Sequence, residues 1–166
     1  AGARYEYTFM DVKYAQSPDR NYSATMSDIV PSALVSYNLG MTKSLKLSYA
    51  MRISRPGIEY LNPYVNNSDP TSISYGNPDL DTEKSHSLGL SFSSFVQKFM
   101  MDCRLGYEFQ NNGIALYQTL KDGVMSATYG NIAKSKDLSM SLWANYTPWA
   151  KTRVMINFYG HYSDYK

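Results

Sequence analysis

The sequence has little cysteine, little charge and no long hydrophobic run, and each shortage excludes a class of protein. Cys103 is the only cysteine among 166 residues, so an intramolecular disulfide and a cysteine-based zinc site are both excluded. Charged residues make up 18% of the chain and leave a formal net charge of +2, a balance that indicates no nucleic-acid partner. No stretch approaches the roughly 20 consecutive apolar residues of a membrane-spanning helix. A helical membrane protein is therefore excluded, whereas a membrane β-barrel is not.

Apolar and polar residues alternate with a period of two along most of the chain, which is typical of β-strands. The clearest stretch places five apolar side chains on one face: Leu45, Leu47, Tyr49, Met51 and Ile53. The opposite faces consist largely of small polar residues, and aromatic residues gather near the expected strand ends. No stretch has a convincing helical period. The pattern predicts an all-β protein.

Seven long strands account for the alternation if two irregularities are bulges within strands. The apolar parity changes at residues 111–113 and again between 133 and 136, and either change could mark a turn or a β-bulge. We expect an antiparallel up-and-down meander of seven strands, or eight if one irregularity is a turn. The expected strands are 3–16, 32–39, 44–53, 85–94, 99–119, 124–147 and 152–165. Residues 1–166 then form one unit.

Long and short connections alternate along this meander. The links at 40–43, 93–98 and 148–151 are short, whereas 17–30 and 54–84 are long and rich in turn-forming residues. Bacterial outer-membrane barrels have short periplasmic turns and longer external loops. We therefore expect part of a transmembrane β-barrel in which residues 54–84 form a long external loop between two adjacent strands. A soluble β-sandwich has the same alternation and remains the alternative.

Residues 49–90 carry a resemblance to a known family. The run from Tyr49 to Pro56 is followed at fixed spacing by 61–64 (Leu-Asn-Pro-Tyr), 69–70 (Asp-Pro), 76–80 (Gly-Asn-Pro-Asp-Leu), Glu83 and 88–90 (Leu-Gly-Leu). This order resembles the barrel region of TonB-dependent outer-membrane receptors, as do residues 3–8 and 31–33. One departure is Thr82, where relatives commonly have proline, and it bears on the rigidity of that loop.

The resemblance implies a 22-stranded barrel around a plug domain, which imports a scarce nutrient with energy relayed through TonB from the inner membrane. It implies the outer membrane of a Gram-negative cell, with outer-membrane lipid, the plug, the TonB system and an unidentified nutrient as partners. The chain carries no plug, energy-coupling box, signal peptide or terminal aromatic residue, so we expect a piece of a barrel. Its first and last strands are then expected to pair with each other, or edge to edge with another copy.

Two groups of side chains are candidates for contact with the plug or the nutrient. The charged residues of the polar faces are expected to line the barrel lumen, mainly in salt bridges: Arg4, Glu6, Lys46, Arg52, Asp102, Arg104 and Glu108. In the long loop, four side chains could contact a ligand, although packing among themselves is the simpler interpretation: Arg55, Tyr60, Tyr64 and Tyr75.

Catalytic and metal-binding patterns are weak. Asn77, Asp79, Asp81 and Glu83 alternate as in a calcium loop, but the positions that require glycine and glutamate hold Thr82 and Leu88. His86 and His161 have many serine neighbours, yet no spacing selects one serine as a nucleophile. We therefore expect no enzyme, no cofactor and no metal site. The alternative function is a soluble all-β module that binds carbohydrate or a similar ligand.

Overall fold

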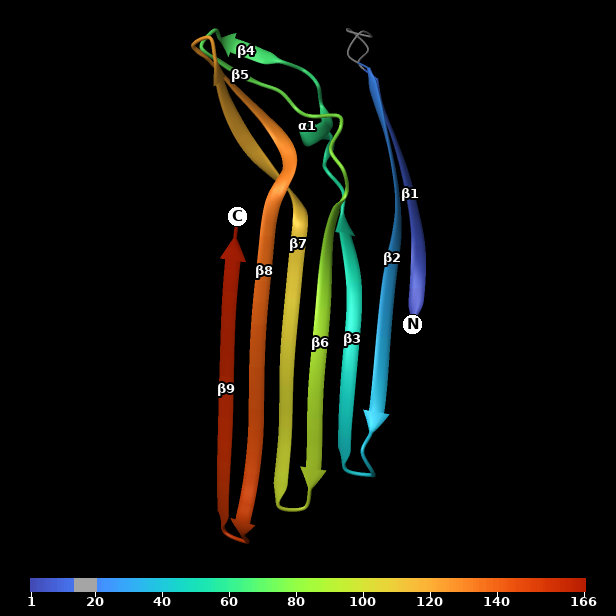
Figure 1. The fold of residues 1–166 in the computed structure, drawn as a ribbon, viewed down its shortest axis with the longest axis vertical. Helices are drawn as coiled ribbons and strands as arrows, with labels where there is room; N and C mark the ends of the chain where they lie inside the picture. Colours follow the sequence, from blue (N-terminus) through green and yellow to red (C-terminus); the bar gives the residue numbers. More distant parts are fainter. Residues whose placement is uncertain (14–20) are drawn as a thin grey trace.

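The computed structural model describes residues 1–13 and 21–166, and its strands form a single β-sheet (Figure 1). Seven long strands pair in antiparallel order β1-β2-β3-β6-β7-β8-β9. Their bounds are β1 Gly2–Val12, β2 Tyr22–Asn38, β3 Lys43–Ser54, β6 Glu83–Val96, β7 Phe99–Lys121, β8 Val124–Trp149 and β9 Thr152–Tyr165. The expected all-β meander of seven long strands is confirmed.

The connections separate the two ends of the sheet. The short turns β2–β3, β6–β7 and β8–β9 lie together at the lower end in Figure 1, and the long β3–β6 connection lies at the other end. The β7–β8 connection at that upper end is tight, because Asp122 and Gly123 both have positive φ angles, of 53° and 80°. Two such residues form the type I′ turn that suits the twist of a hairpin.

Both sequence irregularities lie inside long strands. β7 and β8 pair continuously from Phe99↔Tyr146 to Lys121↔Val124, with shifts of register between Gln110 and Ile114. The interpretation of both irregularities as bulges is therefore confirmed, at residues 111–113 as expected, whereas the shift in β8 lies between Asn131 and Ala133, just before the expected 133–136. A bulge adds an unpaired residue and reverses the parity of the side chains beyond it, which explains the change in the sequence pattern.

The first two strands differ from the prediction. β1 ends at Val12, and part of the predicted segment 13–16 lies outside the described residues. β2 begins at Tyr22, although residues 17–30 were expected to form a loop; 17–20 lie outside the described residues, and 22–30 are strand. Along this part of β2 the polarity is inverted, because Tyr22, Ala24 and Met26 belong to the polar face of the sheet, and serine and threonine alternate with them on the other face.

The connection between β3 and β6 explains that inversion. It contains one helical turn, α1 (Ile58–Leu61), and two short strands, β4 (Asn66–Asp69) and β5 (Ser72–Ser74). Its fully buried Leu61 and its Leu80 form a small core with Met26. The connection covers the polar face of β2 at the upper end, so apolar residues belong there. Although this connection is long, the strands that it joins, β3 and β6, are direct neighbours, paired from Lys43↔Ser94 to Ser54↔Glu83.

Two edges of the sheet remain open. β1 pairs with β2 alone and β9 with β8 alone, so the first and last strands do not close a small barrel within the described chain. The expected closure of β1 onto β9 is therefore absent from the structure. Among the described residues, none of the helical segments is long and apolar enough to cross a membrane.

Candidate functional site

The apolar face of the sheet is a band that ends in aromatic residues and whose three middle rows carry no charge. Strand pairing sets its side chains in rows, of which three successive rows across β3, β6, β7, β8 and β9 are Tyr49-Leu88-Tyr107-Leu138-Tyr162, Leu47-Leu90-Leu105-Met140-Gly160 and Leu45-Phe92-Cys103-Leu142-Phe158. Many of these side chains are strongly exposed, among them Phe158 at 53% and Tyr162 at 65%. A water-soluble monomer rarely exposes so large an apolar surface, so this face needs a nonpolar surrounding.

The height of the band fits a bilayer. Phe99 and Tyr146 form an edge-on aromatic pair at the turn end, and Tyr107 and Phe109 pack together towards the upper end. Phe99 and Phe109 are ten residues apart on β7, which is about 34 Å along the strand and about 26 Å along the membrane normal at the usual strand tilt of about 40°. Outer-membrane barrels have an apolar band about 25 Å tall between two aromatic girdles.

The upper aromatic row holds His86. Its Nδ1 lies 2.9 Å from the Tyr49 hydroxyl, and its ring stacks on Phe109 with centroids 4.9 Å apart. Register with Met51 and Phe109 places His86 on the apolar face. No serine hydroxyl contacts the ring within the described chain, so the arrangement is an aromatic cluster at the edge of the band rather than a nucleophile and its base.

All seven charged residues predicted for the lumen share the polar face of the sheet. The register of β1, β2, β3, β6 and β7 gives the same parity to Arg4, Glu6, Lys46, Arg52, Asp102, Arg104 and Glu108. Two pairs form within single strands, Arg4 with Glu6 and Arg104 with Asp102, whose Nε–Oδ1 distance is 2.7 Å. Within the described chain Lys46, Arg52 and Glu108 form no ion pair.

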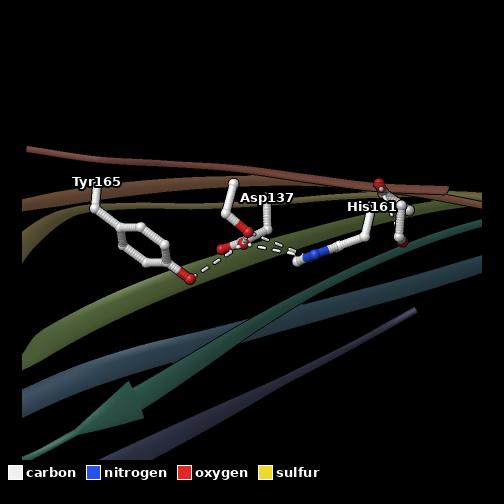
Figure 2. Close-up of polar contacts among 6 residues, drawn as sticks. Asp137, His161 and Tyr165 are labelled. Carbon is white, nitrogen blue, oxygen red and sulfur yellow. Dashed lines mark hydrogen bonds and ion pairs between the residues drawn. The ribbon is translucent and has the colours of Figure 1, made fainter.

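A second polar cluster lies on the same face at the other edge of the sheet, and sequence reasoning missed it. Figure 2 shows His161 and Tyr165 of β9 directed towards Asp137 of β8. The Ser163 hydroxyl donates to Asp137 Oδ1, and the Tyr165 hydroxyl donates to the same oxygen over 3.4 Å. His161 Nε2 lies 3.5 Å from it. Ser163 Oγ also lies 3.4 Å from His161 Nε2, but the one hydroxyl proton of the serine goes to the shorter contact with Asp137, so the three residues do not have the arrangement of a catalytic triad.

The polar face is flat between the two clusters. Ser48, Gly89, Gly106 and Ser139 form one row across β3, β6, β7 and β8. A methyl group added at Gly89 would lie 2.5 Å from Ser48 Oγ, and one added at Gly106 would lie 2.6 Å from Ser139 Oγ. The serine hydroxyls therefore lie over the two glycines, and the row carries only small side chains.

Ion pairs attach the β3–β6 connection and the start of β6 to the first hairpin. Arg55 Nη1 lies 2.9 Å from Glu6 Oε2 on β1. Arg55, the first of the four predicted loop residues, therefore holds the connection against β1. Lys84 Nζ lies 3.0 Å from Oδ1 of Asp28 on β2, whose side chain is 3% exposed. A buried carboxylate requires such a partner. Neither Asp28 nor Lys84 was singled out from the sequence, where both fall in irregular stretches.

Two asparagines attach the same connection to β7 and β8. The Asn112 amide accepts from Lys84 N over 2.9 Å and donates to Thr82 O over 2.8 Å. Asn131 accepts from Asp81 N and donates to Asp81 O, over 2.8 and 3.0 Å. The bulge in β7 lies at Asn112, and the side chain of this residue binds the backbone at Thr82 and Lys84. Asp79, Asp81 and Glu83 join this backbone network, and no cluster in the described ranges could hold a metal ion.

The remaining predicted loop residues lie around two hollows on the connection. Tyr60 packs edge-on against Tyr129 with centroids 4.7 Å apart, and with Arg55 it lines a cleft of about 460 Å³. Tyr64 and Tyr75 line a smaller hollow of about 200 Å³. Tyr64 is 45% exposed. The structure thus brings the four residues together in two pairs and not in one site.

Comparison with known proteins supports a barrel wall. The sequence matches the outer membrane protein beta-barrel family over residues 1–166. No curated protein sequence matches it. Among solved structures, the copper transporter OprC superposes with a TM-score of 0.57 at 13% identity, covering 98% of this chain and 26% of that one. The siderophore receptor PirA from Pseudomonas aeruginosa superposes with a TM-score of 0.52 at 14% identity, covering 98% and 41%.

The family match identifies the family of the chain, and the two solved structures show a likeness of fold. The chain spans about a quarter and two fifths of the two structures that it matches, and at such identities the likeness concerns the fold. The expected resemblance to the barrel region of TonB-dependent receptors is confirmed at that level. With an apolar band of bilayer height on one face and charge on the other, the chain belongs to the outer membrane protein beta-barrel family and forms part of a barrel wall in the outer membrane of a Gram-negative cell.

Proposed function

We propose that this wall belongs to a TonB-dependent receptor, which imports a nutrient across the outer membrane with energy relayed from the inner membrane. The observation that carries the proposal is the contrast between the two faces of one continuous sheet. The apolar face meets lipid, and the polar face lines the lumen with Lys46, Arg52 and Glu108, which form no ion pair within the described residues. Residues 1–166 form one segment of the barrel, and residues 54–84 form an external loop. No covalent step is assigned to the chain.

The polar face gives the wall two tasks. Its charged rows offer partners to a plug domain, and the flat row at Gly89 and Gly106 allows close approach. The loop offers Tyr64 and Tyr75 at the external mouth, where they can contact a nutrient, while Arg55 and Tyr60 hold the loop in place. The names of the two structural neighbours suggest copper ions and siderophores as first probes of the cargo.

The single cysteine provides a test of the two faces. Cys103 belongs to the apolar face and the next residue, Arg104, to the polar face. A fluorophore on Cys103 should be quenched by brominated acyl chains when the protein is reconstituted in a bilayer. The same fluorophore at position 104, introduced as Arg104→Cys in a Cys103→Ser background, should be quenched by aqueous iodide instead. Adjacent positions serve as matched controls for each other.

The rival function predicts a different outcome. In a soluble β-module the apolar face would pack into a protein core, so acyl chains could not reach Cys103. A chain that stays folded and monomeric in plain buffer, and whose Cys103 fluorophore is unaffected by brominated lipid, would contradict the membrane assignment.

Energy coupling requires its own experiment. Cells that express the protein from its whole reading frame should accumulate the cargo when TonB is present and lose that uptake when TonB is deleted. Binding of the cargo to the cell surface should remain in both strains. Equal uptake without TonB would refute energy-coupled import while leaving the barrel wall intact.

A further inference from the structure

The three short turns repeat one pattern. Each pairs an exposed apolar side chain with a lysine: Met41 with Lys43, Val96 with Lys98, and Trp149 with Lys151. Met41 is fully exposed and Trp149 is 72% exposed, although nothing in a short turn requires a large apolar residue. Lysine and tryptophan side chains combine an apolar part with a polar end, which suits the boundary between water and lipid.

Charge is distributed unequally between the two ends of the sheet. Residues 39–43, 95–99 and 147–153 contain four basic residues, Lys43, Lys98, Lys151 and Arg153, and no acidic one. At the other end, residues 55–83 contain five acidic residues and one basic residue. The near-zero net charge of the whole chain hides this difference. The turn end is therefore a basic rim on an otherwise balanced molecule.

The basic side chains of the rim are free to bind a partner. All four are exposed, and none forms an ion pair within the described residues. Lys98 makes only a long contact of 3.5 Å with the carbonyl of Pro148 in the next turn. Lys43 lies on the apolar face in register with Ser94, one row from the aromatic end of the band. Its long side chain can reach from that row to a headgroup layer.

We propose that this rim binds anionic phospholipid headgroups of the leaflet into which the turns are inserted. The three hairpins stand side by side, so successive lysines are about 10 Å apart along the rim at the usual strand spacing. Apolar tips enter the acyl region while the ammonium groups meet phosphates. The proposal rests on the proposed function for the membrane setting, and the short turns then face the periplasm.

The expected preference is measurable. Each basic residue near an anionic lipid surface strengthens binding about fivefold at moderate salt. Three lysines acting together correspond to a preference on the order of 100-fold at most, and salt screening reduces it because the Debye length is about 8 Å at physiological ionic strength. The preference should therefore weaken steadily as salt is added.

Spin-labelled lipids test the proposal directly. The protein, expressed from its whole reading frame, is reconstituted in phosphatidylcholine with trace spin-labelled phosphatidylglycerol or phosphatidylcholine, and the motionally restricted fraction of each label is compared. The variant Lys43→Gln/Lys98→Gln/Lys151→Gln should lose the preference for phosphatidylglycerol. The matched variant Lys13→Gln/Lys46→Gln/Lys121→Gln, away from the rim, removes the same charge and should keep the preference.

Each other outcome overturns the proposal. Equal loss in both variants would mean that net charge and not the rim selects the lipid. No preference in the unmodified protein would mean that the rim has another occupant, such as an acidic protein. Quenching of a Cys103 fluorophore by brominated acyl chains in the same samples separates this failure from a failure of the membrane assignment. A far-UV spectrum typical of β-sheet checks that each variant is folded.

Discussion

Leu61 should control whether the β3–β6 connection stays ordered on the polar face. It is the one side chain that is fully buried among the described residues, and it packs in the small core with Met26 and Leu80. Leu61→Ala removes three carbon atoms from that core and leaves a cavity. The long strands do not depend on this core, because their backbone ladders continue beyond it. The expected defect is therefore local opening of the connection and not unfolding of the sheet.

The expected loss of stability follows from the complete burial of the Leu61 side chain. Leucine-to-alanine changes at fully buried sites cost about 3 to 5 kcal/mol, and the lower end applies here because the core is small and can partly collapse. A cost of about 3 kcal/mol raises the population of the open connection about 100-fold. Hydrogen exchange reports this at the amides of Gly76 and Asn77, which donate to the carbonyls of Asn62 and Tyr60 over 2.9 and 2.6 Å.

Two comparisons make the result decisive. Leu120→Ala removes the same atoms from a side chain that is 74% exposed, so it should change exchange at Gly76 less than threefold. The amide of Phe95, which donates to Thr42 O over 2.8 Å at the turn end, should be unaffected by either change. Exchange at Gly76 that rises less than tenfold in Leu61→Ala, or that rises equally at Phe95, would refute the reasoning.

Three further changes test the attachment of the connection. Asn112→Ala removes two hydrogen bonds and should weaken the connection by about 2 kcal/mol, measured by the same exchange, whereas its exposed neighbour in Asn111→Ala should have no effect. Gly76→Ala should open it even more, by about 3 kcal/mol or more, because the added methyl group would lie 2.5 Å from a backbone oxygen. The backbone N–H of Thr71, and then its hydroxyl, hold the pKa of Asp69 below the ordinary aspartate value. Because the folded pKa is depressed, this turn is stabilised above the ordinary value of about 3.9 and loses that contribution as the pH falls through the folded pKa. In Thr71→Ala a carboxyl NMR titration should show the pKa of Asp69 moved only part of the way back, since the N–H remains, and an unchanged pKa would contradict the role of the hydroxyl.

Much of the wall could be predicted because its two faces meet different solvents. Wherever one face is apolar and the other polar, as from Leu45 to Ile53, alternation fixes both the strand and its orientation. The bulge at Asn112 could be located too, because it reverses the parity of a pattern that is otherwise strict. The adjacency of β3 and β6 followed from two such patterns on either side of a long connection.

The features that the sequence did not predict depend on contacts between segments that are far apart in the chain. Residues 22–30 lie under the β3–β6 connection, so Met26 is buried and Tyr22 partly buried on the face that is polar elsewhere. Without the connection in place, that stretch has no consistent apolar face. The Asp137 cluster likewise needs the register of β8 and β9, which places His161 and Ser163 beside it. Alternation gives the face of each residue but not its neighbour across the strands.

The short strand β5 limits how the sheet can misassemble. It pairs in parallel with residues 125–127 of β8, on the edge that β9 occupies from Ser135 to Trp149. Between them, the carbonyl of Tyr129 accepts from Asn77, and Asn131 bonds to Asp81. The Tyr129 carbonyl and residues 125–127 of β8 are therefore already occupied, which limits how far β9 could shift upward along β8. A shift by an odd number of residues would turn the side chains of β9 to the wrong face.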